Sequence, residues 1–414
     1  MTWQFEVATN PSDDVGAVAQ HRPAPPLPAH LPALDGLRAL AVFVVVQHNL
    51  ALLHSDQGLL AHHLGNMLHR GWVGVQLFFV LSGFLITRIL LDTQQSPNYY
   101  ASFYSRRALR IFPLYYAVLI GLFLVLPALW HLPAVLTEDG PASRQVWLWL
   151  YLSNWTGARG LGGGTTPVFH FWSLAVEEQF YLLWPLVVRH CTPRRLMQVC
   201  VGVVVGAMLC RAVELVLGSD PQAIYTSTLS RMDALALGAM VAAWLRSPWR
   251  PSADRATVSK LLRATAAVAV AGWIITRGYP GFTVTEESIG FTLVALVFAG
   301  LIAAGVLAAS VPDAQGRWYR ALAAPLLRPV ARYSYAIYVF HVPLHVLVGL
   351  PLLERWVGTR TPSVGPTLAY MAVMTVLSYA VAWLSYRLIE RPFLRLRQPA
   401  LLADQDPQRV PQFR

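Results

Sequence analysis

Residues 170–184, HFWSLAVEEQFYLLW, place polar side chains inside an otherwise apolar stretch of the chain. At helical spacing His170, Ser173 or Leu174, Glu177 and Tyr181 share one face. A carboxylate in hydrocarbon is costly unless it faces a bundle interior or a wet cavity. Glu177 is therefore a catalytic candidate. The alternative is a structural polar pair that joins two helices.

A second candidate is His48, which follows Arg38 in the segment LDGLRALAVFVVVQHN, residues 34–49. Arg38 sits at the inner edge of this span, and His48 lies about 15 Å further along a helix axis, close to mid-membrane. A neutral imidazole there can act as a general base. Glu177 falls about 10 Å down a helix that enters from the outer side, so the two are expected to meet, with the carboxylate fixing the imidazole tautomer. The alternative is a histidine that merely bonds a neighbouring helix.

A basic cluster follows the second apolar stretch in a predicted loop and consists of Arg106, Arg107 and Arg110. Guanidinium groups bind phosphate bidentately, so the cluster suits a polyphosphate such as coenzyme A. Topology alone offers another explanation, because arginines gather at inner membrane boundaries. Ser82 and Gly83 form a small pair that lets another helix or a thin ligand approach closely.

Histidines elsewhere in the chain are weaker candidates. His341 is a buried imidazole in a later apolar segment, and Tyr338 lies three residues before it on the same side. A loop after the first span holds four more, without metal-ligand spacing, so no metal site is predicted: His54, His62, His63 and His69. The glycine run at 160–164 lacks the Lys-Ser/Thr of a phosphate loop and is interpreted as a flexible outer turn.

These residues belong to a chain with the composition of a membrane protein. Of its 414 residues, 55% are hydrophobic and only 13% are charged, and the mean hydropathy is +0.46. Soluble domains carry about 25% charged residues, so the deficit indicates a polytopic membrane protein. The net charge of +11 comes from arginines clustered between apolar spans, which argues against nucleic acid as a partner. The three cysteines show no zinc spacing.

The fold class predicted is all-α, a polytopic membrane helix bundle with ten spans and both termini cytoplasmic. Every second connection is rich in arginine, which marks the cytoplasmic side. Residues 146–155 are apolar but too short to cross, so we expect an interfacial or re-entrant segment on the outer side. The ten predicted spans are 35–53, 71–91, 109–130, 170–189, 196–217, 229–246, 263–279, 289–310, 333–352 and 365–387.

Three regions are expected along the chain. Residues 1–33 are proline-rich, show no cleaved signal peptide and are predicted to form a disordered cytoplasmic tail. Residues 34–397 form the membrane domain, and residues 398–414 form a second cytoplasmic tail. No internal repeat is visible, which weakens a transporter built on duplicated halves.

Taken together, several motifs resemble the acyltransferase-3 family of integral-membrane acyltransferases, which modify bacterial surface sugars and some antibiotics. The resemblance spans residues 31–397, and the order and spacing of the motifs make it specific. The resemblance implies ten membrane helices around a channel in the bacterial inner membrane. It also implies acyl-coenzyme A as donor substrate, no permanently bound cofactor, and a hydroxyl of a carbohydrate or small hydroxylated molecule as acceptor. The motifs are LDGLRALA at 34–41, FFVLSGF at 78–84, RRALRIFP at 106–113, FWSLAVE at 171–177, SYAIYVFH at 334–341 and ERP at 390–392.

The chain departs from the family pattern at the first span. The family usually places ten residues between the arginine and the histidine, whereas Arg38 and His48 enclose nine and Asn49 occupies the usual histidine position. One residue turns a helix by about 100°, so the base is either displaced or absent. Many relatives also append a soluble esterase-like domain. Without it, the acceptor is expected to be recognised by the membrane domain or supplied by a partner protein.

The resulting hypothesis is an O-acyltransferase that moves an acyl group, acetyl above all, from a cytoplasmic thioester to an acceptor hydroxyl. His48 backed by Glu177 is the predicted base, and Ser173, Tyr338 and His341 are candidates for contact with the acceptor or the oxyanion. Two other classes stay open, a transporter or flippase and a catalytically silent subunit of a polysaccharide-export complex. The predicted acyl-coenzyme A site consists of Arg38, Arg106, Arg107, Arg110, Ser82 and Gly83.

Overall fold

The computed structural model describes residues 28, 30–53, 57–130, 145–155, 166–279, 283–360 and 362–396. Within these ranges the regular structure is helical, with no strand, and the protein is a multi-pass membrane helix bundle as predicted. The predicted tails lie almost wholly outside the described residues, as do His54 and the glycine run at 160–164.

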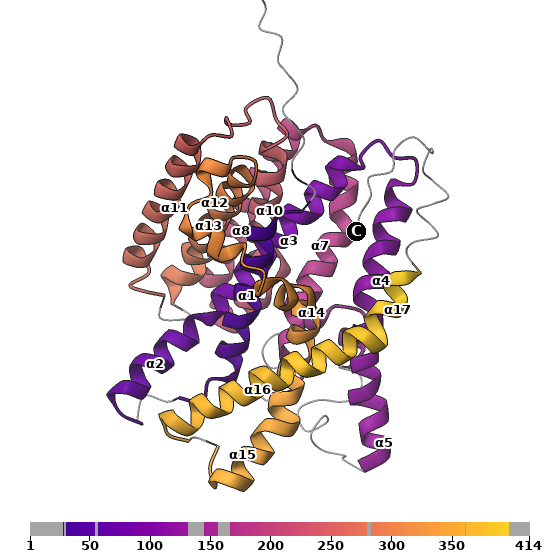
Figure 1. Ribbon diagram of the computed structural model, residues 1–414, viewed down its shortest axis with the longest axis vertical. Coiled ribbons are helices and arrows are strands. Elements are labelled where there is room, and N and C mark those ends of the chain that lie inside the picture. The colour runs from indigo at the N-terminus through magenta and orange to yellow at the C-terminus, as the bar shows by residue number, and fades with distance from the viewer. Residues whose placement is uncertain are drawn as a thin grey trace, which may run out of the picture.

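The longer helices of the bundle are α1 (Pro32–Leu50), α2 (Leu59–His69), α3 (Val73–Asp92), α4 (Tyr99–Ile120), α7 (Trp172–His190), α8 (Pro193–Val216), α10 (Thr228–Trp244), α11 (Arg255–Ile275), α12 (Phe291–Ala309), α14 (Leu327–Leu344) and α16 (Val364–Ser385). The short ones are α5 (Leu126–Trp130), α6 (Gln145–Trp149), α9 (Pro221–Thr226), α13 (Arg317–Leu322), α15 (Leu350–Val357) and α17 (Arg391–Arg395). Figure 1 shows α11 on one side of the bundle and α4 on the other, with α1, α3, α7 and α10 between them.

Among the described residues, eight continuous helical stretches are long and apolar enough to cross a membrane. The two remaining predicted spans correspond to α7 and α10. The former carries Glu177, Glu178 and Arg189 within 19 residues, and the latter is 17 residues long. Both are helices of the bundle, and the count of ten crossings stays a prediction. Residues 146–155 contain only the short α6 and a 3₁₀ turn, Ser153–Trp155, far too short to span.

Helix starts follow from local sequence. Pro32 occupies the first turn of α1, where a missing N–H costs nothing. Thr192, Asp220 and Asp254 cap α8, α9 and α11 by accepting a backbone N–H at each helix start. The hydrogen bonds that Asp254 accepts, first from Ser252 and then from the Thr257 backbone, hold the pKa of its carboxyl below the usual value.

The centre of the bundle depends on backbone contact between α3 and α10. A Cβ atom at Gly83 would lie 1.9 Å from the carbonyl oxygen of Leu235, and one at Gly238 would lie 2.0 Å from that of Val80. Only glycine lets two helices approach this closely. Of the small pair at 82–83, Gly83 therefore serves helix packing, because it lets α3 approach α10 closely.

One sequence prediction about the basic cluster is wrong. Arg106 and Arg107 were expected in a loop before the span predicted at 109–130, but α4 begins at Tyr99 and already contains them, with Arg110 near its middle. Arginine is a good helix former and its long side chain reaches the interface from a helical backbone, so the helix continues past the apolar stretch. Adjacent residues on a helix point about 100° apart, so Arg106 and Arg107 face different directions.

Candidate active site

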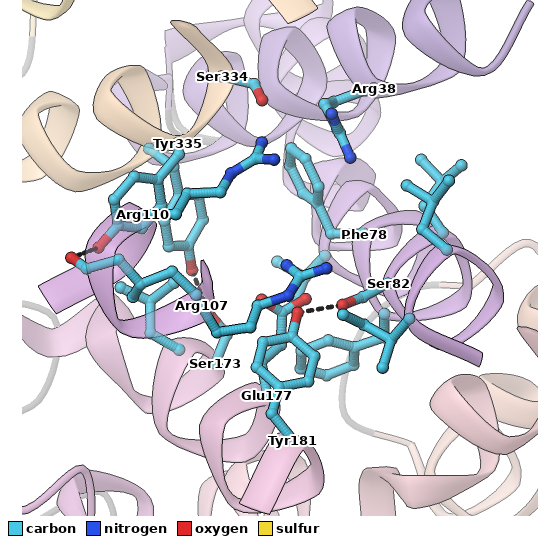
Figure 2. A pocket seen from close by; sticks show the side chains of 18 of the residues that line it. Arg38, Phe78, Ser82, Arg107, Arg110, Ser173, Glu177, Tyr181, Ser334 and Tyr335 are labelled. Carbon is cyan, nitrogen blue, oxygen red and sulfur yellow. Dashed lines mark hydrogen bonds between the residues drawn. The ribbon is translucent and has the colours of Figure 1, made fainter. Parts of the chain in front are cut away.

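A cavity of about 310 Å³ opens between α1, α3, α4, α7 and α14. Arg38, Arg107 and Arg110 line it, and we call it the arginine cavity. Figure 2 shows the three guanidinium groups turned toward its open middle, Arg38 from α1 and the other two from α4. Among the described residues, none of the three has a carboxylate oxygen within the 4.0 Å of an ion pair. Three cations without such a partner make this cavity suitable for an anion.

One face of α7 forms another wall of the arginine cavity, next to Arg107. Ser173, Glu177 and Tyr181 recur every four residues and all line the arginine cavity, as the helical spacing of residues 170–184 predicts. The Tyr181 hydroxyl is hydrogen-bonded to Ser82 on α3. Glu177 lies beside both of them and beside Arg107 (Figure 2). The guanidinium of Arg107 also stands 5.2 Å from the centre of the Tyr181 ring.

Two members of the predicted acyl-coenzyme A set do not line the arginine cavity. Arg106 points away from it and donates a hydrogen bond to Ser102 within α4. Gly83 faces α10, whereas its neighbour Ser82 lines the cavity. Both corrections have the same cause, since adjacent residues on a helix point about 100° apart.

A second cavity, of about 540 Å³, is lined by His48, His69 and His170, and we call it the histidine cavity. Asn49, Arg70, Glu286 and several aromatic rings complete its wall. Val75 and Tyr338 line both cavities, so the two spaces adjoin across these side chains.

The structure does not bring His48 and Glu177 together. His48 lines the histidine cavity and its Nδ1 bonds the carbonyl oxygen of Leu68 at 3.2 Å, whereas Glu177 lines the arginine cavity. Equal depth along two helices does not fix the direction in which the side chains point. Glycine at position 71 allows the chain to pack against His48, because a Cβ there would lie 2.5 Å from the Cβ of His48. Because a carbonyl only accepts, Nδ1 of His48 carries the proton and Nε2 offers a lone pair.

Asn49, at the position where the family usually has histidine, bonds a different imidazole. Its amide nitrogen donates to Nε2 of His341 at 3.0 Å, and Nδ1 of His341 donates to the carbonyl of Tyr338 at 2.6 Å. Neutral His341 therefore has no N–H left for an oxyanion, which contradicts the role predicted for it. Ser173, in the arginine cavity, and Tyr338, on the shared wall, have hydroxyl oxygens 2.5 Å apart, and both hydroxyls also reach the carbonyl oxygen of His170. The contact predicted for them with the acceptor or the oxyanion stays a prediction.

His62, His63 and His69 were expected in a loop but lie on helix α2. Among the described residues no group of three metal-ligating side chains occurs. Nε2 of His62 is bonded to the side-chain amide of Asn66 at 3.0 Å, and the rings of His62 and His63 pack edge to face.

Sequence reasoning missed a charged network behind the histidine cavity. Arg231 on α10 is fully buried and donates to the amide oxygen of Gln76 at 2.6 Å. Its guanidinium lies 4.2 Å from the ring centre of Phe291 and 4.8 Å from that of Tyr225, and both rings line the histidine cavity. The arginine thus holds the aromatic wall by cation–π contacts.

A second buried arginine joins α8 to α10. Arg211 and Asp233 are both fully buried and form an ion pair at 3.1 Å. Thr292 on α12 links to both, accepting from Arg211 at 2.6 Å and donating to Asp233 at 2.6 Å. The signal for this network was present in the sequence, because charged residues inside predicted spans rarely occur without partners.

The chain is similar in sequence to known acyltransferases along most of its length. A family model described as an acyltransferase domain, that of the acyltransferase-3 family, matches residues 31–387. The peptidoglycan O-acetyltransferase OatA of Listeria monocytogenes is 28% identical over 381 residues, which cover 88% of this chain and 56% of that protein. The putative peptidoglycan O-acetyltransferase YrhL of Bacillus subtilis is 28% identical over 379 residues, covering 88% and 55%. The O-acetyltransferase OatA of Staphylococcus aureus is 27% identical over 389 residues, covering 88% and 57%.

The match is long in this chain but partial in the relatives. The chain spans little more than half the length of the curated relatives it matches. No solved structure gives a significant match. The family model covers most of the chain, including every residue of both cavities. The chain therefore belongs to the acyltransferase-3 family.

Proposed function

We propose that the protein is an integral-membrane O-acyltransferase of the bacterial inner membrane. It moves an acetyl group from acetyl-coenzyme A on the cytoplasmic side to a hydroxyl of a cell-wall carbohydrate. The observation that carries this proposal is the convergence of three arginines on one cavity that shares a wall with a second, histidine-lined cavity. The names of the relatives, peptidoglycan O-acetyltransferases, support the acyl group and the acceptor class.

On the donor side, Arg38, Arg107 and Arg110 hold the phosphates of the nucleotide. The thin pantetheine arm then extends past Ser82 toward the wall shared by the two cavities. In this proposal Glu177 does not assist His48. It lies beside Arg107, Ser82 and Tyr181 and holds these side chains, which border the path of the pantetheine arm. The basic connections predicted on the cytoplasmic side support entry of the donor from that side.

On the acceptor side, His48 remains the proposed base. Its Nδ1 proton is held by the Leu68 carbonyl, which leaves the Nε2 lone pair to remove the proton of the acceptor hydroxyl. The alkoxide oxygen attacks the thioester carbonyl, the carbon–sulfur bond breaks, and the departing thiolate receives a proton, returned through the imidazolium. The products are the O-acetylated sugar and free coenzyme A.

The test measures free thiol released from acetyl-coenzyme A by the protein in nanodiscs, with a glycan acceptor supplied. We expect His48→Ala to lower the rate by about 10²- to 10⁴-fold, the usual contribution of a general base. Asn49→Ala loses the hydrogen bond to His341 and one side chain of the cavity wall but keeps the base, so it is expected to keep a larger share of the rate.

Other outcomes would assign the chemistry differently. Loss of activity only in Asn49→Ala would move the essential role one residue along the chain. Full activity in His48→Ala would remove this residue from the mechanism. If the wild type moved glycan across the membrane without releasing thiol, the enzymatic function would be wrong and a transporter would be favoured.

A further inference from the structure

His170 lines the histidine cavity, and one of its ring nitrogens has no hydrogen-bond partner among the described residues. The residue lies in a 3₁₀ turn, Phe169–Phe171, just before α7, and only 2% of it is exposed. Its Nε2 bonds the carbonyl oxygen of Tyr338 at 2.9 Å, so Nε2 must carry the proton. Nδ1 is then a lone-pair acceptor, and no described residue bonds it.

The other two buried imidazoles among the described residues, His341 and His345, have hydrogen-bond partners. Nε2 of His341 accepts from Asn49 at 3.0 Å, and Nδ1 of His345 is bonded to the Tyr370 hydroxyl at 2.6 Å. Buried polar atoms in native proteins nearly always have partners, so an unpartnered nitrogen on a residue that lines a cavity points to a ligand that supplies one. The missing partner must be a hydrogen-bond donor, because the nitrogen of His170 can only accept.

The rest of the cavity indicates what kind of donor this is. Trp72, Trp172 and Tyr225 offer flat apolar rings, while Arg70 and Gln222 add polar groups to the same wall. A volume of about 540 Å³ admits one or two sugar rings. A pyranose presents both matching features, a C–H face that packs on aromatic rings and hydroxyl groups that donate hydrogen bonds.

We propose that the histidine cavity is the carbohydrate-binding site and that Nδ1 of His170 accepts a hydrogen bond from a sugar hydroxyl. This inference rests on the proposed function and names the acceptor site for it. The carbonyl of Tyr338 anchors the imidazole, and Tyr338 also lines the arginine cavity. His170 therefore binds the sugar at the wall that separates it from the donor, while His48 in the same cavity takes the proton.

The experiment measures equilibrium binding of the disaccharide N-acetylglucosaminyl-N-acetylmuramic acid to the full chain in nanodiscs, without acetyl-coenzyme A. His170→Phe keeps an aromatic ring but removes the lone pair, and we expect the Kd to rise about fivefold to tenfold, the usual effect of one neutral hydrogen bond. His170→Gln, whose amide both donates and accepts, is expected to restore part of the affinity. His63→Phe, an exposed histidine on α2 outside the cavity wall, is the matched control and is expected to change nothing.

A second variant tests the cavity without removing a buried group. Gln222→Trp adds a large side chain to the cavity wall and is expected to abolish disaccharide binding. Unchanged affinity in both His170→Phe and Gln222→Trp, or no disaccharide binding by the wild type, would overturn the assignment. Thiol release is measured in parallel. If the wild type binds the disaccharide but never releases thiol, the proposed function is wrong and the binding site stands. If both variants transfer the acetyl group with an unaltered KM for the acceptor, only the binding-site assignment is wrong.

Discussion

Two neighbouring arginines on α4 are expected to differ sharply in their effect on the donor. Arg107 lines the arginine cavity, whereas Arg106 lies outside it and bonds Ser102. A hydrogen bond between a guanidinium and a phosphate contributes about 1.5–3 kcal/mol, which corresponds to about 10- to 150-fold in affinity. Under the proposed function, Arg107→Ala should therefore raise the KM for acetyl-coenzyme A by one to two orders of magnitude.

The size of the effect depends on geometry as well as charge. Arg107 makes no ion pair within 4.0 Å among the described side chains, so its removal leaves no carboxylate newly unpaired at that distance. Arg107→Lys keeps the charge but loses the planar fork, and we expect it to fall between the wild type and the alanine variant. The loss in Arg107→Ala should shrink as ionic strength rises, because salt screens the phosphate–arginine attraction in an open cavity.

The assay is the dependence of thiol release on acetyl-coenzyme A concentration, at saturating acceptor, in wild type, Arg107→Ala, Arg107→Lys and Arg106→Ala. Arg106→Ala is the matched control and should leave KM within about twofold of the wild type, as expected for a surface substitution. Equal damage from both alanine variants would refute the reasoning, because topology would then explain both arginines. A fall in kcat with an unchanged KM in Arg107→Ala would also refute it.

Two further predictions concern the scaffold. Gly83→Leu would place a Cβ 1.9 Å from the carbonyl oxygen of Leu235, so we expect it to lower the free energy of unfolding in detergent by about 1–3 kcal/mol or more. The control is Gly202→Leu on α8, where a Cβ would have no atom within 4 Å, and we expect its effect to be near zero. Asp233→Asn leaves the buried charge of Arg211 uncompensated and should lower the free energy of unfolding by about 3–5 kcal/mol in the same assay. A loss under about 1 kcal/mol would show that the ion pair does not stabilise the fold.

Local chemistry along the sequence was enough to predict several features. Low charge and long apolar runs predicted a polytopic helical membrane protein, and the described residues confirm the helical bundle. The four-residue recurrence of Ser173, Glu177 and Tyr181 predicted that they share a face, and all three line one cavity. Both results follow from the fixed geometry of one helix, which a single sequence specifies.

Contacts between helices decided the rest. His48 and Glu177 were predicted to meet because their depths match, yet they line different cavities. Depth follows from counting residues along each helix, but the direction of a side chain depends on how that helix is rotated and what packs beside it. The approach of Gly71 to His48 and the bond between Asn49 and His341 set that direction here, and neither is visible in the spacing of α1.

The sequence by itself determined which residues carry charge and which face of each helix they occupy. Only the tertiary structure decided that Arg107 but not Arg106 reaches the arginine cavity, and that His170 is left with an unbonded nitrogen. The reason is physical. Residue type and helical period are properties of consecutive residues, whereas a cavity and an unpartnered atom arise where several helices, distant in sequence, stop short of filling the same space.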